Sequence, residues 1–286
     1  MGRILITGAL GNVGRYVAKY ALKNNQDITV ASRNIEALRR EFGNHATCVS
    51  FDFTNPDTFD AALADVDRVF IMRPPHLGKP EDLKPFIHAL QKRKNITLVC
   101  FLSLIGIEHN PVPPHYKIEK YIEKAGLPYC HIRPSFFMQN ISGIHAFEIK
   151  HFNQLVVPVG KSLTSFIDAE DIGELTAKVL SEADTHKNSK YSLTGAEAID
   201  YYEAASILSK HLNREIMYTN PKPSLAKKYW RNIRALDKDY VFVMGMLYMM
   251  TRLGTAKTVT TTYEDIMGKK PQSFSQFVEK NIDCWK

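Results

Sequence analysis

Apolar, β-branched runs alternate with amphipathic segments through the first half of the chain. The apolar runs predict strands over residues 3–7, 27–32, 47–51, 68–72, 97–102 and 129–133. The segments between them carry helix start signals; Asn55-Pro56, for example, places a proline at a helix start. Strands that alternate with helices over short connections are typical of βαβ units, so the pattern predicts a parallel sheet.

The alternation weakens after about residue 150. There the sequence predicts a short apolar run at 155–159, a helix at 170–181 and a strand at 190–194 that returns to the main sheet. The remaining segments predict helices near 201–212, 224–235, 239–252 and 273–281. The expected fold is therefore α/β. It combines a Rossmann-type, doubly wound parallel sheet over 1–150 with a smaller, mainly helical C-terminal lobe over 151–286.

Three glycines, Gly8, Gly11 and Gly14, lie where the first predicted strand ends and the first helix begins. A strand that leads into a helix start directs unpaired backbone N–H groups and the positive end of the helix dipole at one point, which attracts an anion such as a diphosphate. The G-x-x-G-x-x-G spacing differs from the G-x-G-x-x-G fingerprint, but the strand, turn, helix and second strand around it strengthen the signal. The sequence thus predicts a dinucleotide site, with a purely structural glycine turn as the alternative.

The second predicted strand ends at Ser32-Arg33-Asn34, where NAD-selective folds keep an acid for the ribose 2′-hydroxyl. Arg33 suits a 2′-phosphate instead, so NADP(H) is favoured over NAD(H); the alternative places Arg33 on a solvated helix start. Ligands of open α/β sheets bind beyond the carboxyl ends of the strands, so we expect one cleft there for cofactor and a small-molecule substrate. The residues expected to bind the cofactor are Gly8, Leu10, Gly11, Asn12, Val13, Gly14, Ser32, Arg33, Met72, Arg73, Pro74, Ser103 and Pro134.

The composition narrows the class of protein. A chain of 286 residues, 44% of them apolar, can bury one large domain or two unequal ones. The four cysteines (Cys48, Cys100, Cys130 and Cys284) lie far apart and show no metal-ligand spacing, so we expect them to be reduced and expect no metal. No apolar run reaches the roughly 18 residues of a membrane span and no leader precedes the first strand, so we expect a cytoplasmic protein without membrane association.

Two segments of the second half allow two interpretations each. The net charge of +7 is partly concentrated at 222–234, which is either a patch for nucleic acid or an acidic partner, or a solvated helix face. Its few aromatic residues favour the solvated face, and no nucleic acid is expected. The stretch 240–250 is apolar on all sides and rich in methionine, which predicts a buried helix, with a pocket wall or a subunit contact as the alternative. The oligomeric state, monomer or homodimer, stays open.

Candidate catalytic residues follow the fifth predicted strand. Ser103 would point into the cleft, where a carbonyl of the substrate or of nicotinamide needs a donor. In the next helix, His115 and Glu119 share a face at i and i+4, whereas Lys117 points about 200° away from His115. His115 is therefore the first candidate, as a donor to the nicotinamide ribose or as a general acid near neutral pH. Lys117 would replace it if the helix begins later, and the structural alternative is a His115 bonded to Glu119.

The chain also resembles the NmrA-like branch of the atypical short-chain dehydrogenase/reductases, which includes bacterial quinone and triphenylmethane reductases, over nearly its whole length. The matching motifs are the glycine turn, Ser32-Arg33-Asn34, Phe51-Asp52-Phe53, Gly126-Leu-Pro-Tyr-Cys-His-Ile-Arg133-Pro134, Phe166-Ile-Asp168-Ala-Glu-Asp171-Ile-Gly and Tyr191-Ser-Leu-Thr-Gly195. The resemblance implies NADPH in the cleft, with Asp52 and Phe53 beside adenine. It also implies Phe136 beside nicotinamide, and Phe137 and Asn140 beside the substrate.

The Tyr-x-x-x-Lys acid of the wider superfamily is missing. Counted back from Gly126-Leu127, the lysine register falls on His115 and the tyrosine register on Pro111. Tyr116 and Lys120 have the bare spacing but are shifted by five residues, so we treat this match as accidental.

The leading hypothesis is an NADPH-dependent reductase, without metal or flavin, that transfers hydride to a small conjugated or carbonyl-bearing, quinone-like substrate. A reduced quinone oxygen is a weakly basic phenolate, which water or His115 can protonate, so the missing tyrosine is compatible with catalysis. The alternative is a non-catalytic NADP(H)-binding redox sensor of the NmrA-like type.

Overall fold

The computed structural model describes residues 2–286, which form two compact units. The first extends to Pro134 and includes Ala169–Leu193, and the second consists of Ser135–Asp168 and Thr194–Lys286. This division differs from the one expected at residue 150. Residues 135–150 join the second unit because their apolar side chains, such as Met138 and Ile149, are buried in its core.

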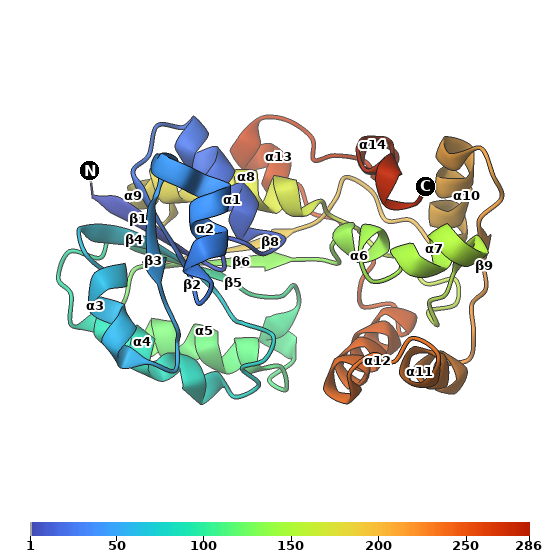
Figure 1. Ribbon diagram of the computed structural model, residues 1–286, viewed down its shortest axis with the longest axis horizontal. Helices are drawn as coiled ribbons and strands as arrows, with labels where there is room; N and C mark the ends of the chain where they lie inside the picture. The colour runs from blue at the N-terminus through green and yellow to red at the C-terminus, as the bar shows by residue number, and fades with distance from the viewer. Residues whose placement is uncertain (1) are drawn as a thin grey trace. The chain divides into compact units, whose positions relative to one another are not determined.

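A seven-stranded sheet forms the centre of the first unit, in the order β3-β2-β1-β4-β5-β6-β8 (Figure 1). All neighbouring strands pair in parallel. The strands are β1 (Arg3–Thr7), β2 (Ile28–Ser32), β3 (Thr47–Ser50), β4 (Val66–Met72), β5 (Leu98–Leu102), β6 (Tyr129–Pro134) and β8 (Ser189–Leu193). The predicted doubly wound sheet is confirmed, and its order reverses at β1, the switch point where such sheets bind ligands.

Helices cover both faces of this sheet. They are α1 (Gly14–Lys23), α2 (Ile35–Phe42), α3 (Phe59–Ala62), α4 (Lys84–Gln91), α5 (Pro114–Lys124), α8 (Ala169–Ser181) and α9 (Ala183–His186). Short 3-10 turns lie at Gly43–His45, Pro56–Thr58, Pro80–Leu83 and Ile107–His109. α1 and α8 lie together on one face, and α4 and α5 on the other (Figure 1). The α1–α8 contact requires Gly173, because a Cβ there would lie 2.4 Å from Tyr16 Cβ.

An aromatic cluster fills the core beneath α3 and α4. The rings of Phe51 and Phe53 meet edge to face at 4.8 Å, and Phe86 contacts both. Each fully buried side chain of this size stabilises the fold by about 1.5–3 kcal/mol. Cys100 and Cys130 are buried as paired neighbours on β5 and β6, and the cysteines form no disulfide among residues 2–286.

The second unit is mainly helical. Its helices are α6 (Gln139–Ser142), α7 (Ala146–Phe152), α10 (Tyr201–Leu212), α11 (Pro223–Asn232), α12 (Lys238–Arg252), α13 (Thr262–Met267) and α14 (Phe274–Lys280), followed by a 3-10 turn at Ile282–Cys284. β7 (Gln154–Leu155) pairs in parallel with β9 (Met217–Tyr218). The predicted apolar run 155–159 thus contributes only its first residue to a strand, and α13 and β9 had no clear sequence signal.

α12 departs from its predicted burial. Val241, Met244 and Tyr248 are buried in the unit's core, but Phe242 is 65% and Leu253, just beyond the helix, 71% exposed. The expectation of a buried helix is therefore wrong for one half of its surface, because only one side of α12 is packed against other described residues. Among residues 2–286, no helix combines the length and the apolar character that a membrane crossing requires.

Candidate functional site

The turn between β1 and α1 leaves several backbone N–H groups unpaired. Gly8 has φ +66°, and Gly11 N donates to the Gly8 carbonyl at 2.8 Å. The N–H groups of Leu10, Asn12 and Val13 have no acceptor within residues 2–286, and no side chain caps α1. Together with the helix dipole, these donors make the turn an anion-binding site.

Close packing explains why the turn needs glycine. A Cβ on Gly14 would lie 2.2 Å from the Gly8 carbonyl oxygen, and one on Gly8 would lie 2.8 Å from Met72 Cε. Arg15 also stabilises the turn, since its Nη2 donates to the Leu10 carbonyl at 3.0 Å. The Arg15 contact had no sequence signal, because a guanidinium that follows a glycine turn can equally face solvent.

Arg33 lies exposed at the end of β2 and has no hydrogen bond or ion pair with the described residues. Asn34 caps α2 by accepting from Ala37 N at 3.0 Å. Nearby, Asp52 accepts hydrogen bonds from Thr54 N and Oγ1 at 2.8 and 2.7 Å, which lower the pKa of its carboxyl; the charge of Arg33 lowers it further. An unpaired guanidinium beside this turn has the chemistry to bind a second phosphate.

Two of the expected cofactor residues are engaged by the protein itself. The ring of Phe53 is buried in the aromatic cluster, so only its main chain is left for a ligand. Arg73 Nη1 donates to the carbonyls of Pro74 and Leu77, at 3.1 and 2.6 Å, which holds the loop after β4.

Three buried polar atoms near the ends of β4 and β5 and the start of α5 lack a well-formed hydrogen bond: Arg73 Nε, Ser103 Oγ and His115 Nδ1. The Ser103 hydroxyl lies near Glu119 and helps to lower the pKa of that carboxyl, without full hydrogen-bond geometry. The His115 ring packs on Phe101, with centroids 5.9 Å apart. Buried polar groups normally find partners, so these three atoms are candidates for hydrogen bonds with a ligand.

The pKa of His115 is lowered to about 3, first by burial and then by the charge of Arg73, against a small opposing effect of Glu119. The imidazole is therefore neutral at neutral pH. A neutral His115 differs from the general acid near neutral pH that the sequence predicted, because burial disfavours the charged imidazolium. A neutral imidazole can still donate one N–H.

The alternatives to His115 can be judged from α5. The helix begins at Pro114, so Lys117 lies inside it, exposed, and the condition for Lys117 to replace His115 is not met. Glu119 does not bond to His115; it is held by Arg133, with Nε–Oε1 2.9 Å and Nη2–Oε2 2.6 Å.

A group of potential metal ligands lies between α5 and β6: Glu119 and Glu123 of the helix and His131 of the strand, with ligand atoms within 4.8 Å of one another. The carboxylate of Glu123 is already paired with cations, since Nζ of Lys120 and Nζ of Lys190 each lie 2.8 Å from one of its oxygens. Burial opposes ionisation of Glu123, but these two lysines outweigh it and lower its pKa to about 2. A metal ion would have to displace these partners, so the arrangement fits a charge network better than a metal site.

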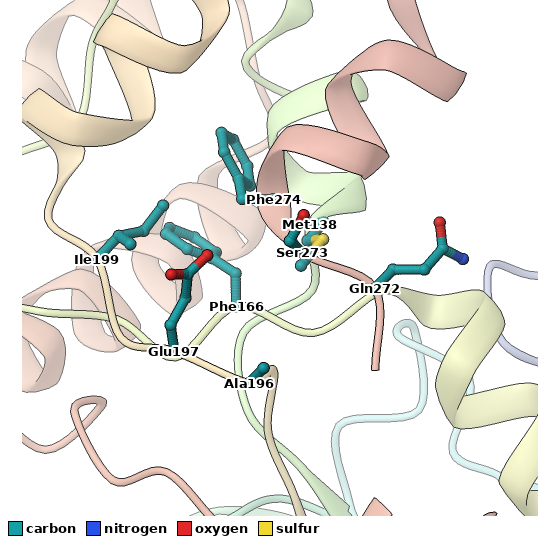
Figure 2. Close-up of a pocket in the computed structure, with 8 residues that line it drawn as sticks. All are labelled: Met138, Phe166, Ala196, Glu197, Ile199, Gln272, Ser273 and Phe274. Carbon is teal, nitrogen blue, oxygen red and sulfur yellow. The ribbon is translucent and has the colours of Figure 1, made fainter. Parts of the chain in front are cut away.

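The residues expected near the substrate lie in the second unit. Phe136 stacks on Tyr248 at 6.0 Å, Phe137 bridges to Ile167, and Asn140 N donates to the Phe137 carbonyl. The same unit holds a pocket with room for about one water molecule (about 10 Å³), which is too small for a substrate (Figure 2). Its lining residues are Met138, Phe166, Ala196, Glu197, Ile199, Gln272, Ser273 and Phe274.

An open parallel sheet whose order reverses at β1, with an anion-binding turn at that point, defines a doubly wound fold of the dinucleotide-binding class. Within that class the chain belongs to the NmrA-like family, whose model matches residues 1–245. The resemblance predicted from the sequence motifs is thereby confirmed.

Relatives match along almost the whole chain. Prestalk A differentiation protein A of Dictyostelium discoideum is 32% identical, over 98% of this chain and 92% of that protein. An NAD(P)H azoreductase of Xenophilus azovorans is 23% identical, over 96% of each.

Two solved structures share the fold. The NADPH-dependent quinone oxidoreductase QOR2 of Escherichia coli, complexed with NADPH, has a TM-score of 0.88 at 19% identity, covering 98% of this chain and 99% of that one. The triphenylmethane reductase of Citrobacter sp., complexed with NADP(H), has a TM-score of 0.87 at 18% identity, covering 97% and 99%.

Proposed function

We propose that this protein is an NADP(H)-dependent reductase that transfers hydride to a small conjugated or carbonyl-bearing, quinone-like molecule. The observation that carries the proposal is the pairing of an open anion site at the β1–α1 turn with the unpaired guanidinium of Arg33. The names of similar proteins, an azoreductase and a quinone oxidoreductase, support the reaction class.

The residues present fit the cofactor. The unpaired N–H groups of Leu10, Asn12 and Val13 would hold the diphosphate, and the close-packed Gly8 and Gly14 keep the turn free of side chains. Arg33 would hold the 2′-phosphate, which NAD(H) lacks.

The bound dinucleotide supplies the hydride, and solvent or a protein donor supplies the proton that completes reduction of a quinone to a hydroquinone. Ser103 and His115 would donate hydrogen bonds to carbonyl or ribose oxygens, since their polar atoms are buried without well-formed partners. Because His115 is neutral, it would orient and polarise its partner rather than act as a charged acid. A phenolate product is weakly basic, so water can protonate it.

A fluorescence titration with NADPH and NADH tests the cofactor. Arg33→Ala is expected to weaken NADPH binding by about tenfold or more and to leave NADH binding unchanged, because one charge-assisted phosphate contact is lost. Arg39→Ala, which removes an exposed arginine of α2 paired with Glu36, is the matched control. A wild-type protein with no preference for NADPH would contradict the proposed role of Arg33.

Turnover is tested separately with a panel of quinones, enones and azo dyes, by the loss of NADPH absorbance. Oxidation of NADPH by at least one acceptor class supports the reductase. Tight NADPH binding without turnover across the panel would overturn it in favour of the redox sensor.

A further inference from the structure

One half of the α12 surface is apolar and exposed. The helix buries Val241, Met244 and Tyr248, while its other side and its C-terminal end present a continuous apolar strip. The exposed members of the strip are Tyr240, Phe242, Val243, Leu247, Met249 and Leu253. A helix that is apolar on all sides is normally buried on all sides, so this strip lacks a partner within residues 2–286.

The neighbouring helix α11 is basic and lies against α12 (Figure 1). The contact is close at Gly245, where a Cβ would lie 2.4 Å from Lys227 Cε, so the lysine stem packs across α12. Lys228 and Arg231 are exposed on the same helix and form no ion pair within residues 2–286. Two further apolar side chains at this helix, Leu225 and Ile233, are 57% and 69% exposed.

Charge is concentrated in this region. Residues 222–257 contain eight Lys or Arg against two Asp, a net charge of +6 out of +7 for the whole chain. Of these basic residues, Arg234 is neutralised by the buried Glu148. The others are exposed, and Lys227, Lys228 and Arg231 lie on α11, which packs against α12. This segment of the chain therefore combines exposed apolar side chains with most of the excess charge of the protein.

We propose that this α11–α12 surface, residues 222–257, docks on the surface of a membrane that contains anionic lipid. The apolar strip would enter the boundary between headgroups and acyl chains, and the lysines and arginines would lie against the phosphates. Charge complementarity selects this occupant. A second copy of the chain would bring one strongly positive surface against another, and a nucleic acid would leave the apolar strip exposed to water.

Co-sedimentation of the full-length protein with vesicles tests the proposal. Vesicles of phosphatidylcholine alone are compared with vesicles that also contain phosphatidylglycerol, at low and at high salt. We expect binding to the anionic vesicles only, weakened by salt because exposed charges are screened.

Two double variants test the apolar contact and the charge attraction separately. Phe242→Ser with Leu253→Ser removes apolar contact, and Lys228→Glu with Arg231→Glu reverses charge; each is expected to lower the bound fraction about tenfold or more. The matched controls on the first unit are Val112→Ser, a 75% exposed apolar residue, and Lys92→Glu with Lys94→Glu; both are expected to bind like the wild type. Circular dichroism checks that every variant is folded.

Three results would overturn the proposal. The first is a wild-type protein that stays in the supernatant with anionic vesicles, and the second is binding that the α11–α12 variants do not reduce. The third is a homodimer in sedimentation velocity that Phe242→Ser with Leu253→Ser dissociates, together with no vesicle binding. None of these results bears on cofactor binding, which is measured independently.

Discussion

Arg133 holds the carboxylate of Glu119 through two parallel hydrogen bonds, from Nε to Oε1 at 2.9 Å and from Nη2 to Oε2 at 2.6 Å. Both side chains are nearly inaccessible to solvent, at 8% and 2% exposed. The pair ties α5 to the end of β6 and occupies the only carboxylate that the sequence had offered to His115. Nδ1 of His115 has no hydrogen-bond partner among residues 2–286.

Glu119→Ala is expected to lower the free energy of unfolding by about 3 kcal/mol, because it leaves a buried guanidinium without its bidentate partner. The remaining bond from Arg133 Nη1 to Glu108, at 3.0 Å, keeps the loss near the lower end of the range for broken buried pairs. Urea unfolding measures the change. Glu36→Ala, in the exposed pair with Arg39, is the control and should cost at most about 0.5 kcal/mol. Equal losses in the free energy of unfolding in Glu119→Ala and Glu36→Ala would show that the buried pair contributes no more to stability than the exposed one.

Gly14→Ala is expected to weaken NADPH binding by at least about tenfold, because the new methyl group would lie 2.2 Å from the Gly8 carbonyl and must displace the diphosphate turn. Gly78→Ala is the matched control, since a Cβ at that position meets nothing within 4 Å. Fluorescence titration gives both affinities, and circular dichroism confirms folding. Unchanged affinity in folded Gly14→Ala would remove the turn from the cofactor site.

Buried histidines predict a loss of stability on mild acidification. Burial lowers the pKa of His131 to about 4 and that of His145 to about 3, from 6.5 in the unfolded chain. Below pH 6.5 the unfolded chain therefore takes up protons that the folded chain does not. The free energy of unfolding should fall with decreasing pH, by up to about 1.4 kcal/mol per pH unit for each histidine.

Urea unfolding between about pH 6.5 and 5.5 measures this slope, in a window where most carboxylates stay ionised. His145→Gln should make the slope shallower, because one of the proton-linked groups is gone. His109→Gln, at an exposed position, is the control and should leave the slope in place. A slope that His145→Gln does not change would contradict a neutral, buried His145.

His115→Ala is expected to lower kcat for NADPH oxidation by roughly ten- to a hundredfold, because one preorganised donor is lost. His115→Asn should retain more activity, since its amide also donates an N–H. The wild-type rate should not depend on a group that titrates near neutral pH at this position, because the pKa of His115 is held near 3. If the wild-type rate changed with pH near neutrality and this change disappeared in His115→Asn, His115 would instead act as a general acid.

Lys117→Ala tests whether Lys117, the other candidate on α5, has a catalytic role. Lys117 lies exposed within α5, so its loss should leave kcat and KM unchanged in the same assay. A large fall in kcat would mean that the start of α5 unwinds when ligands bind.

The sequence by itself determined the sheet, the glycine turn and the family. These features depend on local patterns: β-branched runs form buried strands, and glycine is needed where Gly14 meets the Gly8 carbonyl. The same locality explains why the sequence could point to Leu10, Asn12 and Val13 as candidate cofactor-binding residues, since a turn leaves its own N–H groups unpaired.

Only the tertiary structure decided which side chains are buried or paired within the protein and which remain free to contact a ligand. The ring of Phe53 packs against Phe86 of α4, Glu119 is held by Arg133, and burial beside Arg73 makes His115 neutral. The sequence also did not predict which half of α12 is exposed. A helix that is apolar on all sides gives no sequence signal for the side that has no packing partner among residues 2–286. Burial and charge pairing depend on contacts between residues far apart in the chain, and periodicity does not encode them.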